Sequence, residues 1–225
     1  MGAAASFVIP VLNEEALIGG LLTELRRRYP GCELVVVDGG SSDHTVAAAM
    51  PACDHLLVAP ADRAAQMNLG ARSARGDYLF FLHADSLPGL SAAGLEGLLA
   101  EAPDWGFCRV RLSGEALAHR VIAWFMNWRS RLTRVATGDQ MLFLQRKLFE
   151  ETGGFDDIPL MEDVAYCKRL RKLASPRVVS DPVLSSSRRW VVHGTLRSVV
   201  RMWLLRLGYF LGVSPATLWR YYYGR

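Results

Sequence analysis

Residues 33–45 read ELVVVDGGSSDHT. The first part of this stretch is an unbroken apolar run that ends in the carboxylate of Asp38, and two glycines and several hydroxyl side chains follow it. An apolar run without alternation is typical of a parallel strand that is buried on both faces. The next helix is predicted to begin near Thr45, with Asp43 as its cap. A buried strand that leads directly into a helix is the repeating unit of α/β folds, whose ligands bind beyond the carboxyl ends of the strands.

The same alternation of strand and helix continues on both sides of this stretch. Apolar runs predict strands at 6–10, 55–58 and 78–82, and apolar residues at helical spacing predict helices at 14–29 and 63–75. The sequence therefore predicts an α/β fold of the Rossmann-like kind, in which helices flank a mostly parallel sheet.

The second half of the chain is less regular. We expect strands at 105–112 and 140–144, helices at 116–131, 163–172, 196–211 and 215–222, and a Ser-rich loop at 182–189. The chain contains no Ser/Gly/Pro-rich linker, low-complexity tract or internal repeat. We therefore predict a single domain at 1–190, and a C-terminal basic and aromatic helical extension at 191–225 that packs on the same domain.

The composition fits a folded protein, since 51% of the 225 residues are apolar and 21% are charged. The four cysteines, Cys32, Cys53, Cys108 and Cys167, are scattered and form no CxxC pair. This spacing argues against a structural zinc site or a disulfide framework and favours a reducing compartment. The amino terminus lacks a charged segment followed by a free-standing apolar stretch, so we predict no secretory signal and a cytoplasmic location.

Positive charge is concentrated near the carboxyl terminus. The net charge is +4, and no acidic residue follows Asp181. The arginines after it are Arg188, Arg189, Arg197, Arg201, Arg206, Arg220 and Arg225. Such a block attracts phosphate groups, and arginines interrupt the apolar segment 196–211, which is therefore not expected to span a membrane. We predict peripheral contact with the inner face of the membrane and no nucleic-acid partner. The alternatives are a helix docked wholly on its own domain and a solvated basic tail.

Three predicted strands end in loops that carry polar residues, at 10–15, 38–43 and 83–86. Because the carboxyl ends of parallel strands lie at one edge of a sheet, we expect these loops to converge on one crevice. Asp38 can accept hydrogen bonds there from a nucleobase or a ribose. A dinucleotide site is the competing interpretation, but it requires a GxGxxG pattern after the first strand, and residues 10–19 contain none.

Two further segments contain candidate catalytic or metal-binding groups. In FFLHADSLP, residues 80–88, His83 and Asp85 are two residues apart, so in an extended chain they point the same way and can hold a hard divalent cation. An ordinary loop is the alternative. In MEDVAYCKRLRK, residues 161–172, Asp163 can act as a general base on an acceptor hydroxyl, or it can merely cap the helix.

Five segments in order resemble the glycosyltransferases of family 2, which have the GT-A fold. They are IPVLNEE (9–15), VVVDGGSSDHT (35–45), the RxxQxNxGA pattern (63–71), LHAD (82–85) and MED (161–163). Each segment is weak evidence alone, but together their order and spacing are highly specific. The RAAQMNLGA and LHAD variants resemble a bacterial branch of the family whose substrate is unsettled.

The resemblance implies a role for each matching residue. The residues expected to contact the nucleotide sugar are Pro10, Asn13, Glu14, Asp38, Arg63, Asn68, Arg188 and Arg189. The residues expected to recognise the acceptor are Gly138, Asp139 and Gln140. Asp163 corresponds to the catalytic base, with Glu162 beside it, and Asp85 corresponds to the aspartate that binds the metal. His83 stands where the family usually has a further aspartate, which makes it a second candidate ligand.

The implied function is transfer of a sugar from a nucleotide-diphosphate sugar to an acceptor hydroxyl, with inversion at the anomeric carbon and with Mn²⁺ or Mg²⁺ as the cofactor. The sugar, the base and the acceptor are left open, a lipid-linked acceptor being one candidate. A nucleotidyltransferase is the alternative on the same fold, but it would carry a Gly-rich basic loop where residues 11–15 read VLNEE. A nucleotide-binding module without catalysis is the other alternative.

Overall fold

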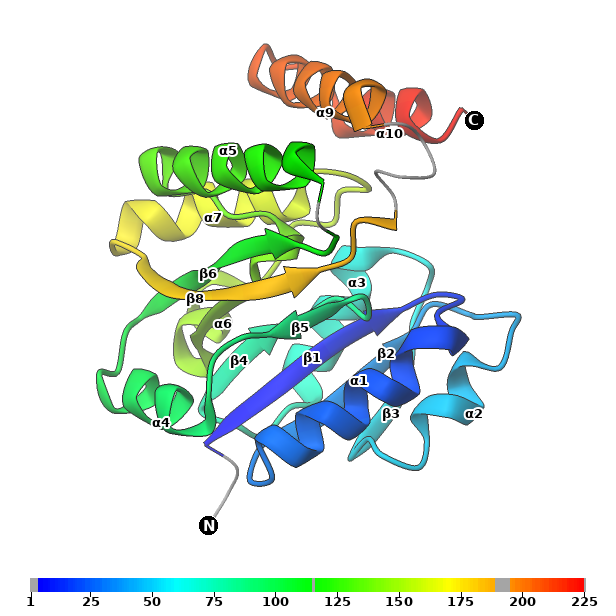
Figure 1. The fold of residues 1–225 in the computed structure, drawn as a ribbon, viewed down its shortest axis with the longest axis vertical. Helices are drawn as coiled ribbons and strands as arrows, with labels where there is room; N and C mark the ends of the chain where they lie inside the picture. The colour runs from blue at the N-terminus through cyan, green and yellow to red at the C-terminus, as the bar shows by residue number, and fades with distance from the viewer. Residues whose placement is uncertain (1–3, 115, 189–194, 225) are drawn as a thin grey trace.

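A computed structural model of the chain describes residues 4–114, 116–188 and 195–224. Within these residues the strands join in one eight-stranded sheet, in the order β3-β2-β1-β4-β7-β6-β8-β5, with helices packed against it (Figure 1). The strands are β1 (Ala5–Val11), β2 (Glu33–Asp38), β3 (His55–Val58), β4 (Tyr78–Phe81), β5 (Ser86–Pro88), β6 (Trp105–Leu112), β7 (Leu142–Gln145) and β8 (Arg177–Ser185). The helices are α1 (Glu15–Arg28), α2 (Thr45–Ala49), α3 (Arg63–Ser73), α4 (Ala92–Ala100), α5 (Leu117–Thr133), the 3-10 helix η1 (Gly138–Gln140), α6 (Arg146–Thr152), α7 (Glu162–Leu173), α9 (Thr195–Phe210) and α10 (Pro215–Tyr223).

Most strands of the sheet run in one direction. β1 pairs in parallel with β2 and β4, and β2 pairs in parallel with β3, so the first four strands end at the same edge. β7 lies antiparallel between β4 and β6, and β8 runs parallel to β6. The predicted α/β fold with a mostly parallel sheet flanked by helices is confirmed.

The sheet curls, because β5 follows β4 closely in the chain yet pairs antiparallel with β8 at the far edge. Four strand spacings would separate the two strands by about 19 Å in a flat sheet. The connection at 82–85 reaches at most about 17 Å when fully extended. The curl therefore brings the two halves of the sheet together around this connection, which contains the predicted metal loop.

β2 is buried along its whole length, as its apolar sequence predicts. Leu34 and Val36 belong to the core cluster shared with α1, and Val35 and Val37 belong to the cluster shared with α3 and α7. Alternate residues of a strand point to opposite faces, so these two clusters lie on the two sides of the sheet.

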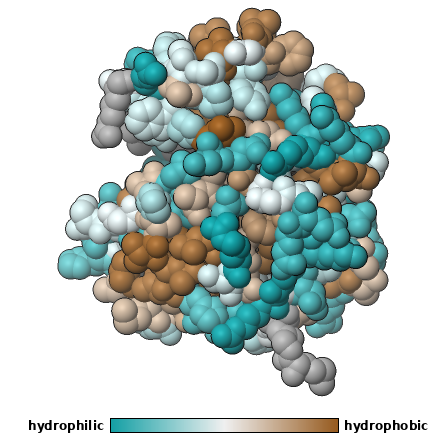
Figure 2. All heavy atoms as spheres, turned by 180° about the vertical axis from the view of Figure 1, so that it is seen from behind, coloured by the Kyte–Doolittle hydropathy of each residue, from teal (hydrophilic) through white to brown (hydrophobic). Residues whose placement is uncertain are grey.

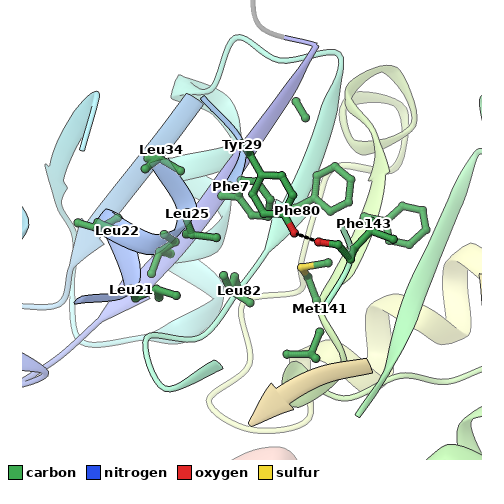
Figure 3. Close-up of a cluster of buried hydrophobic side chains, with 14 of the residues drawn as sticks. Phe7, Leu21, Leu22, Leu25, Tyr29, Leu34, Phe80, Leu82, Met141 and Phe143 are labelled. Carbon is green, nitrogen blue, oxygen red and sulfur yellow. Dashed lines mark hydrogen bonds between the residues drawn. The ribbon is translucent and has the colours of Figure 1, made fainter. Parts of the chain in front are cut away.

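A row of aromatic rings joins the parallel and antiparallel halves of the sheet on one face (Figure 3). Tyr29, Phe7, Phe80 and Phe143 follow one another with 5.3 Å between neighbouring ring centroids. The three phenylalanines come from the adjacent strands β1, β4 and β7. The Tyr29 hydroxyl donates to the Leu90 carbonyl at 2.5 Å, which satisfies its polar end in the core.

Strand β8 corrects the predicted Ser-rich loop at 182–189, because residues 182–185 continue this strand. Val183 and Ser185 are buried and pair with β6, whereas Pro182 lies at a shift in the pairing register. A proline is tolerated at such an irregularity, where no ladder hydrogen bond is needed from it. The proline and the serines concealed the alternation of buried and exposed residues along this strand. The elements β5, α4 and α6 were also not predicted.

Gly70 allows α3 to pack closely on the sheet. A Cβ atom at this position would lie 2.5 Å from Val8 Cγ1 and 2.9 Å from Val37 Cγ2. We expect Gly70→Ala to lower the free energy of unfolding by about 1–3 kcal/mol, measured by urea denaturation, because the buried side chains of Val8 and Val37 must move to make room. Gly20→Ala in α1 is the matched control, since nothing lies within 4 Å of the position that its Cβ atom would occupy, and it should be neutral or stabilising. Equal stability of the two variants would contradict this packing argument.

Helices α9 and α10 pack on the core cluster of α3 and α7 through the buried side chains of Leu205 and Leu218. The Lys168 ammonium group of α7 lies 4.6 Å from the ring centroid of Tyr209. Arg201 donates to the last backbone carbonyls of α10, which holds the two helices together. Among the helices of the described residues, none has the length and apolar character needed to cross a membrane.

Candidate active site

Hydrogen bonds tie the loop after β1 to the loop after β2. The backbone amide of Asn13 donates a hydrogen bond to Ser41 Oγ, and the backbone amide of Ser42 donates one to the side-chain oxygen Oδ1 of Asn13, both at 2.9 Å. The Glu14 amide donates to Thr45 Oγ1 at 2.7 Å. Asn13 has a φ of 55°, a left-handed conformation that asparagine adopts more readily than most residues. These two predicted loops therefore lie side by side at the carboxyl edge of the sheet.

Asp38 uses its carboxylate to shape its own loop. Its Oδ2 accepts hydrogen bonds from the amides of Gly40 and Ser41 at 2.9 Å, and its Oδ1 accepts from Ser41 Oγ at 2.5 Å. The residue is only 3% exposed, and Gly40 has a φ of 86°, which glycine adopts without strain. Contact between Asp38 and a nucleobase stays a prediction.

The RxxQxNxGA pattern of α3 supplies framework contacts as well as a pocket residue. Gln66 Nε2 donates to carbonyl oxygens near the ends of β1 and β2, at 2.9 and 2.8 Å. Asn68 exchanges two hydrogen bonds of 2.9 Å with the backbone of Phe155. Asn68 therefore positions the segment that precedes α7, and Arg63 is the predicted site residue of this helix that lines the pocket.

A pocket lies beside the carboxyl ends of β1 and β4. The predicted site residues that line it are Pro10, Arg63, His83, Gly138, Glu162 and Asp163. The remaining wall is mainly apolar and includes Met67, Phe81, Leu142, Phe155 and Cys167. Residues separated by more than 150 positions in the chain thus meet in one place. Asn13, Glu14, Asp38, Asn68, Asp85, Asp139, Gln140 and Arg188 do not line this pocket.

The acid pair Glu162–Asp163 opens helix α7 at the wall of the pocket. Asp163 accepts hydrogen bonds from the Gly138 amide at 2.9 Å and from the Val164 amide at 2.6 Å. Burial raises the pKa of Asp163. Burial and the neighbouring Asp163 raise the pKa of Glu162 from 4.5 to about 7, against the lowering effect of Arg63, whose Nη1 lies 4.0 Å from Glu162 Oε1. Both carboxyl groups therefore hold a proton more readily than exposed carboxyl groups do.

The raised pKa of Glu162 predicts that the free energy of unfolding depends on pH. A carboxyl group whose pKa is higher in the folded state stabilises the fold below its unfolded pKa and loses this contribution as the pH rises through the folded pKa. We expect the free energy of unfolding of the wild type to fall between pH 4.5 and 7, relative to Glu162→Gln, by at most about 3 kcal/mol. Urea denaturation at several pH values measures this difference. Parallel pH profiles for the two proteins would contradict it.

The loop after β4 is a turn rather than an extended segment. The Ser86 amide donates to the His83 carbonyl at 3.1 Å, and the Ser186 amide, just after β8, donates to the Asp85 carbonyl at 3.0 Å. The premise that His83 and Asp85 point the same way because the chain is extended is therefore wrong. The turn connects β4 to β5, and the Ser186 contact places Asp85 next to the end of β8. His83 lines the pocket, and Gly138 lies so close to its imidazole that a Cβ atom would overlap the ring.

The donors present are compatible with a divalent metal that is bound mainly through a diphosphate. Across residues 4–114, 116–188 and 195–224, no three His, Cys, Asp or Glu side chains gather as a metal site. Mn²⁺ and Mg²⁺ bound to nucleotides take only one or two protein carboxylates, and phosphate oxygens and water complete the coordination. Asp85 is half-buried beside the end of β8, and His83 Nδ1 lies 3.8 Å from Asp139 Oδ1. Asp85, with His83 or Asp139 nearby in the fold, fits this requirement.

The segment predicted to recognise the acceptor forms η1. Gln140 is fully buried, and its Oε1 accepts hydrogen bonds from Ser130 Oγ and from the Thr137 amide, so it caps this turn. Asp139 Oδ1 accepts a hydrogen bond from Ser185 Oγ at 3.2 Å. Gly138 is the member of the segment that reaches the pocket. Acceptor contacts by these residues stay a prediction.

Arg129 is a residue near the site that the sequence analysis did not single out. It lies on α5, burial lowers its pKa, and the nearby carboxylates of Asp163 and Asp139 oppose that shift. Its Nε donates to no acceptor in the part of the chain that the structure describes. A signal was present in the sequence, because Arg129 follows Ile122 and Met126 at helical spacing, on the face that packs inward.

Arg188 links two of the segments that are predicted to contact the donor. Its Nη2 lies 3.4 Å from Glu14 Oε2, which joins the segment after β8 to the loop after β1. Two residues predicted to contact the donor are therefore brought together. Arg189, the other predicted cation of this segment, lies outside the described residues, as does the predicted domain boundary at 190.

Comparison by sequence finds a similarity over the amino-terminal part of the chain. The model of the family described as glycosyl transferase family 2 matches residues 6–101. An uncharacterized glycosyltransferase of Haemophilus influenzae is 33% identical over 88 residues, which cover 36% of this chain and 35% of that protein. The matched family segment includes the loops after β1, β2 and β4 and all of α3, whereas Glu162 and Asp163 lie beyond it.

Comparison by structure extends over most of the chain. A Staphylococcus aureus TarS fragment in complex with UDP has a TM-score of 0.64 and 18% identity, and the alignment covers 83% of this chain and 60% of that one. The mannosyltransferase PcManGT of Pyrobaculum calidifontis, in complex with GDP-Man and Mn²⁺, has a TM-score of 0.60 and 22% identity, covering 83% and 57%. At these identities the likeness shows the fold. The resemblance to the family 2 glycosyltransferases is thus confirmed, by sequence over residues 6–101 and by the GT-A fold over most of the chain.

Proposed function

We propose that the chain transfers a sugar from a nucleotide-diphosphate sugar to an acceptor hydroxyl, with inversion at the anomeric carbon. The observation that carries this proposal is the buried acid pair Glu162–Asp163, which meets Arg63 and Pro10 in a pocket at the carboxyl edge of the sheet. Ligands of open α/β sheets bind at this edge. The family match over residues 6–101 supports a nucleotide sugar as the donor.

Asp163 acts as the general base. Two backbone amides hold its carboxylate, one from Gly138 and one from Val164, so its orientation is set before the acceptor binds. A raised pKa makes the carboxylate a stronger proton acceptor than an exposed aspartate. Asp163 takes the hydroxyl proton of the acceptor as the oxygen forms a bond to the anomeric carbon, and the bond to the diphosphate breaks on the opposite face. Inversion follows from this single displacement.

Arg63 stabilises the departing nucleoside diphosphate, on which negative charge develops. Its guanidinium is partly exposed in the pocket, and its ion pair with Glu162 is long at 4.0 Å, so it can turn toward a phosphate. A divalent Mn²⁺ or Mg²⁺ ion, when bound, supplies further positive charge at the diphosphate. We assign its direct contact to Asp85, with His83 as the second candidate ligand. Of the two solved structures compared above, one contains UDP and the other GDP-Man with Mn²⁺, which is consistent with this class of donor.

The acceptor side is assigned to the half of the pocket nearest Gly138. Gly138 lines the pocket together with the acid pair, and Asp139 and Gln140 follow it directly in the chain. We assign the reaction to the cytoplasmic face of a membrane or to the cytoplasm, where nucleotide sugars are the donors, and a lipid-linked alcohol is one candidate acceptor.

A panel of nucleoside diphosphates and nucleotide sugars, with and without Mn²⁺, tests the donor assignment. A ligand that binds only the folded protein raises its melting temperature. We expect a rise with one nucleoside diphosphate and its sugar conjugates, larger in Mn²⁺ than in chelator. A response to nucleoside triphosphates alone would favour nucleotidyl transfer instead.

A further inference from the structure

One face of α5 is apolar and exposed along the whole helix. Its side chains recur at spacings of three and four residues, which places them in one stripe. The stripe consists of Leu117, Val121, Trp124, Phe125, Trp128 and Leu132, each between 45% and 70% exposed. Single exposed apolar residues are ordinary, whereas a contiguous stripe of this kind marks an interaction surface.

The opposite face of α5 is packed on the sheet. Ala123 is buried against Val110 and Leu112 of β6, with Ile122 and Met126 packed around them. Asn127 then fixes the helix, because its side-chain amide exchanges hydrogen bonds of 2.8 and 2.9 Å with the amide and the carbonyl of Val110. Because the inner face of α5 is packed on β6 and hydrogen-bonded to it, the apolar stripe faces outward.

The stripe contains ordered aromatic rings. The indoles of Trp124 and Trp128 stack with their centroids 6.4 Å apart and an angle of 12° between their planes. Phe125 packs edge-on against Trp124, at a centroid distance of 4.9 Å. Tryptophan is the residue most typical of the boundary between lipid chains and headgroups, because its ring is apolar and its N–H is polar.

The charges that border the stripe have one sign. No acidic residue occurs from 116 to 138, and Arg120, Arg131 and Arg134 are exposed at the ends of α5. α9 repeats the pattern, with exposed apolar residues at similar spacing and no acidic residue in the chain after Asp181. The exposed apolar residues of α9 are Val200, Trp203, Leu204, Leu207 and Phe210.

Helices α5, α9 and α10 all lie toward the same end of the long axis of the molecule (Figure 1). Viewed from behind, hydrophobic side chains gather at the extreme of that end (Figure 2). We propose that the apolar faces of α5 and α9 form a docking surface for an anionic phospholipid bilayer. Aromatic rings enter the headgroup region and the arginines contact lipid phosphates, each adding about 1 kcal/mol of attraction. A second copy of the chain fits less well, because two faces with the same positive charge would repel.

Flotation with vesicles of phosphatidylcholine alone, or of phosphatidylcholine with phosphatidylglycerol, tests this surface without any turnover. We expect the full chain to bind the anionic vesicles and to be released as salt rises from 0.1 to 1 M, where screening shortens from about 10 to 3 Å. The double variant Trp124→Ala/Trp128→Ala should lower the vesicle partition coefficient by at least about tenfold. Arg120→Gln/Arg131→Gln should weaken binding to anionic vesicles only.

Met50→Ala/Val58→Ala is the matched control, since both side chains are apolar and more than 60% exposed but belong to the α2–β3 part of the chain. This variant should float like the wild type. No binding to anionic vesicles, or equal binding by the tryptophan variant and the wild type, would overturn the proposal. Dimerisation in light scattering that the tryptophan variant abolishes, without vesicle binding, would overturn it in favour of a contact between two copies. Circular dichroism of each variant checks that it is folded.

Discussion

Asp163→Asn is expected to lower kcat for sugar transfer by about 10²–10⁴-fold, the usual contribution of a general base. The substitution removes the proton acceptor and changes the side-chain volume little. The carboxamide oxygen can still accept the hydrogen bond that the Gly138 amide donates, so the pocket should keep its shape. Binding of the nucleoside diphosphate, measured by calorimetry in Mn²⁺, should therefore stay near the wild-type level.

Asp157→Asn provides the matched control, because it is an exposed aspartate in the segment just before α7. It should leave both kcat and donor binding unchanged. Near-normal transfer by Asp163→Asn would remove the assignment of the base. Loss of donor binding in this variant would instead give Asp163 a structural role, through its contact with η1.

Asp85→Ala is expected to abolish the contribution of Mn²⁺ to nucleotide binding. Removing a direct ligand should weaken the binding of nucleoside diphosphate in Mn²⁺ by at least about tenfold and should leave binding in chelator unchanged. Turnover should fall by about 10²-fold or more, because the charge on the leaving diphosphate is then poorly stabilised. Titration of each protein with nucleotide, in Mn²⁺ and in chelator, measures the first effect.

Asp181→Ala is the control for this experiment, since Asp181 is an exposed aspartate in the middle of β8, remote in the chain from the loop after β4. Equal losses for Asp85→Ala in Mn²⁺ and in chelator would show that Asp85 shapes the loop, through its backbone contact with Ser186, rather than binding an ion.

The amino-terminal half of the fold could be predicted because its signals are local. The apolar run of β2 is long enough to indicate burial on both faces, and the structure buries every residue of it. Parallel strands end at one edge, so the convergence of the loops after β1 and β2 followed from the order of elements. The same geometry explains why Pro10, Arg63 and His83 line one pocket, and the antiparallel strand β7 begins at this edge, close after Gly138.

The second half was harder to predict because long-range pairing decides its structure. β8 carries Pro182 and several serines, and it is a strand only because β6 and β5 supply partners on its two sides. β5 has three residues, too few for any periodicity to be visible. The strand predicted at 140–144 is displaced to 142–145, because Gln140 is used in the capping of η1.

The polar residues of the motifs have one of two roles: they bind a ligand, or they hold the framework of the fold. The sequence alone does not distinguish these roles. Asn68 contacts the backbone of a residue 87 positions away, and Asp38 satisfies its own loop, so both have hydrogen-bonding roles in the framework. A polar residue that binds a ligand and one that holds a neighbouring backbone have the same local signal. Their partners become visible only in three dimensions.

Proton NMR of a nucleotide sugar incubated with the protein and Mn²⁺ tests the central claim most directly, with water or an added alcohol as the acceptor. The donor is the one selected by the panel of nucleotides, and spectra are taken before the free sugar can equilibrate between its anomers. We predict that nucleoside diphosphate appears together with a sugar of inverted anomeric configuration, and that Asp163→Asn produces neither. Formation of sugar 1-phosphate and nucleoside monophosphate, retention of configuration, or unchanged turnover by Asp163→Asn would contradict the account.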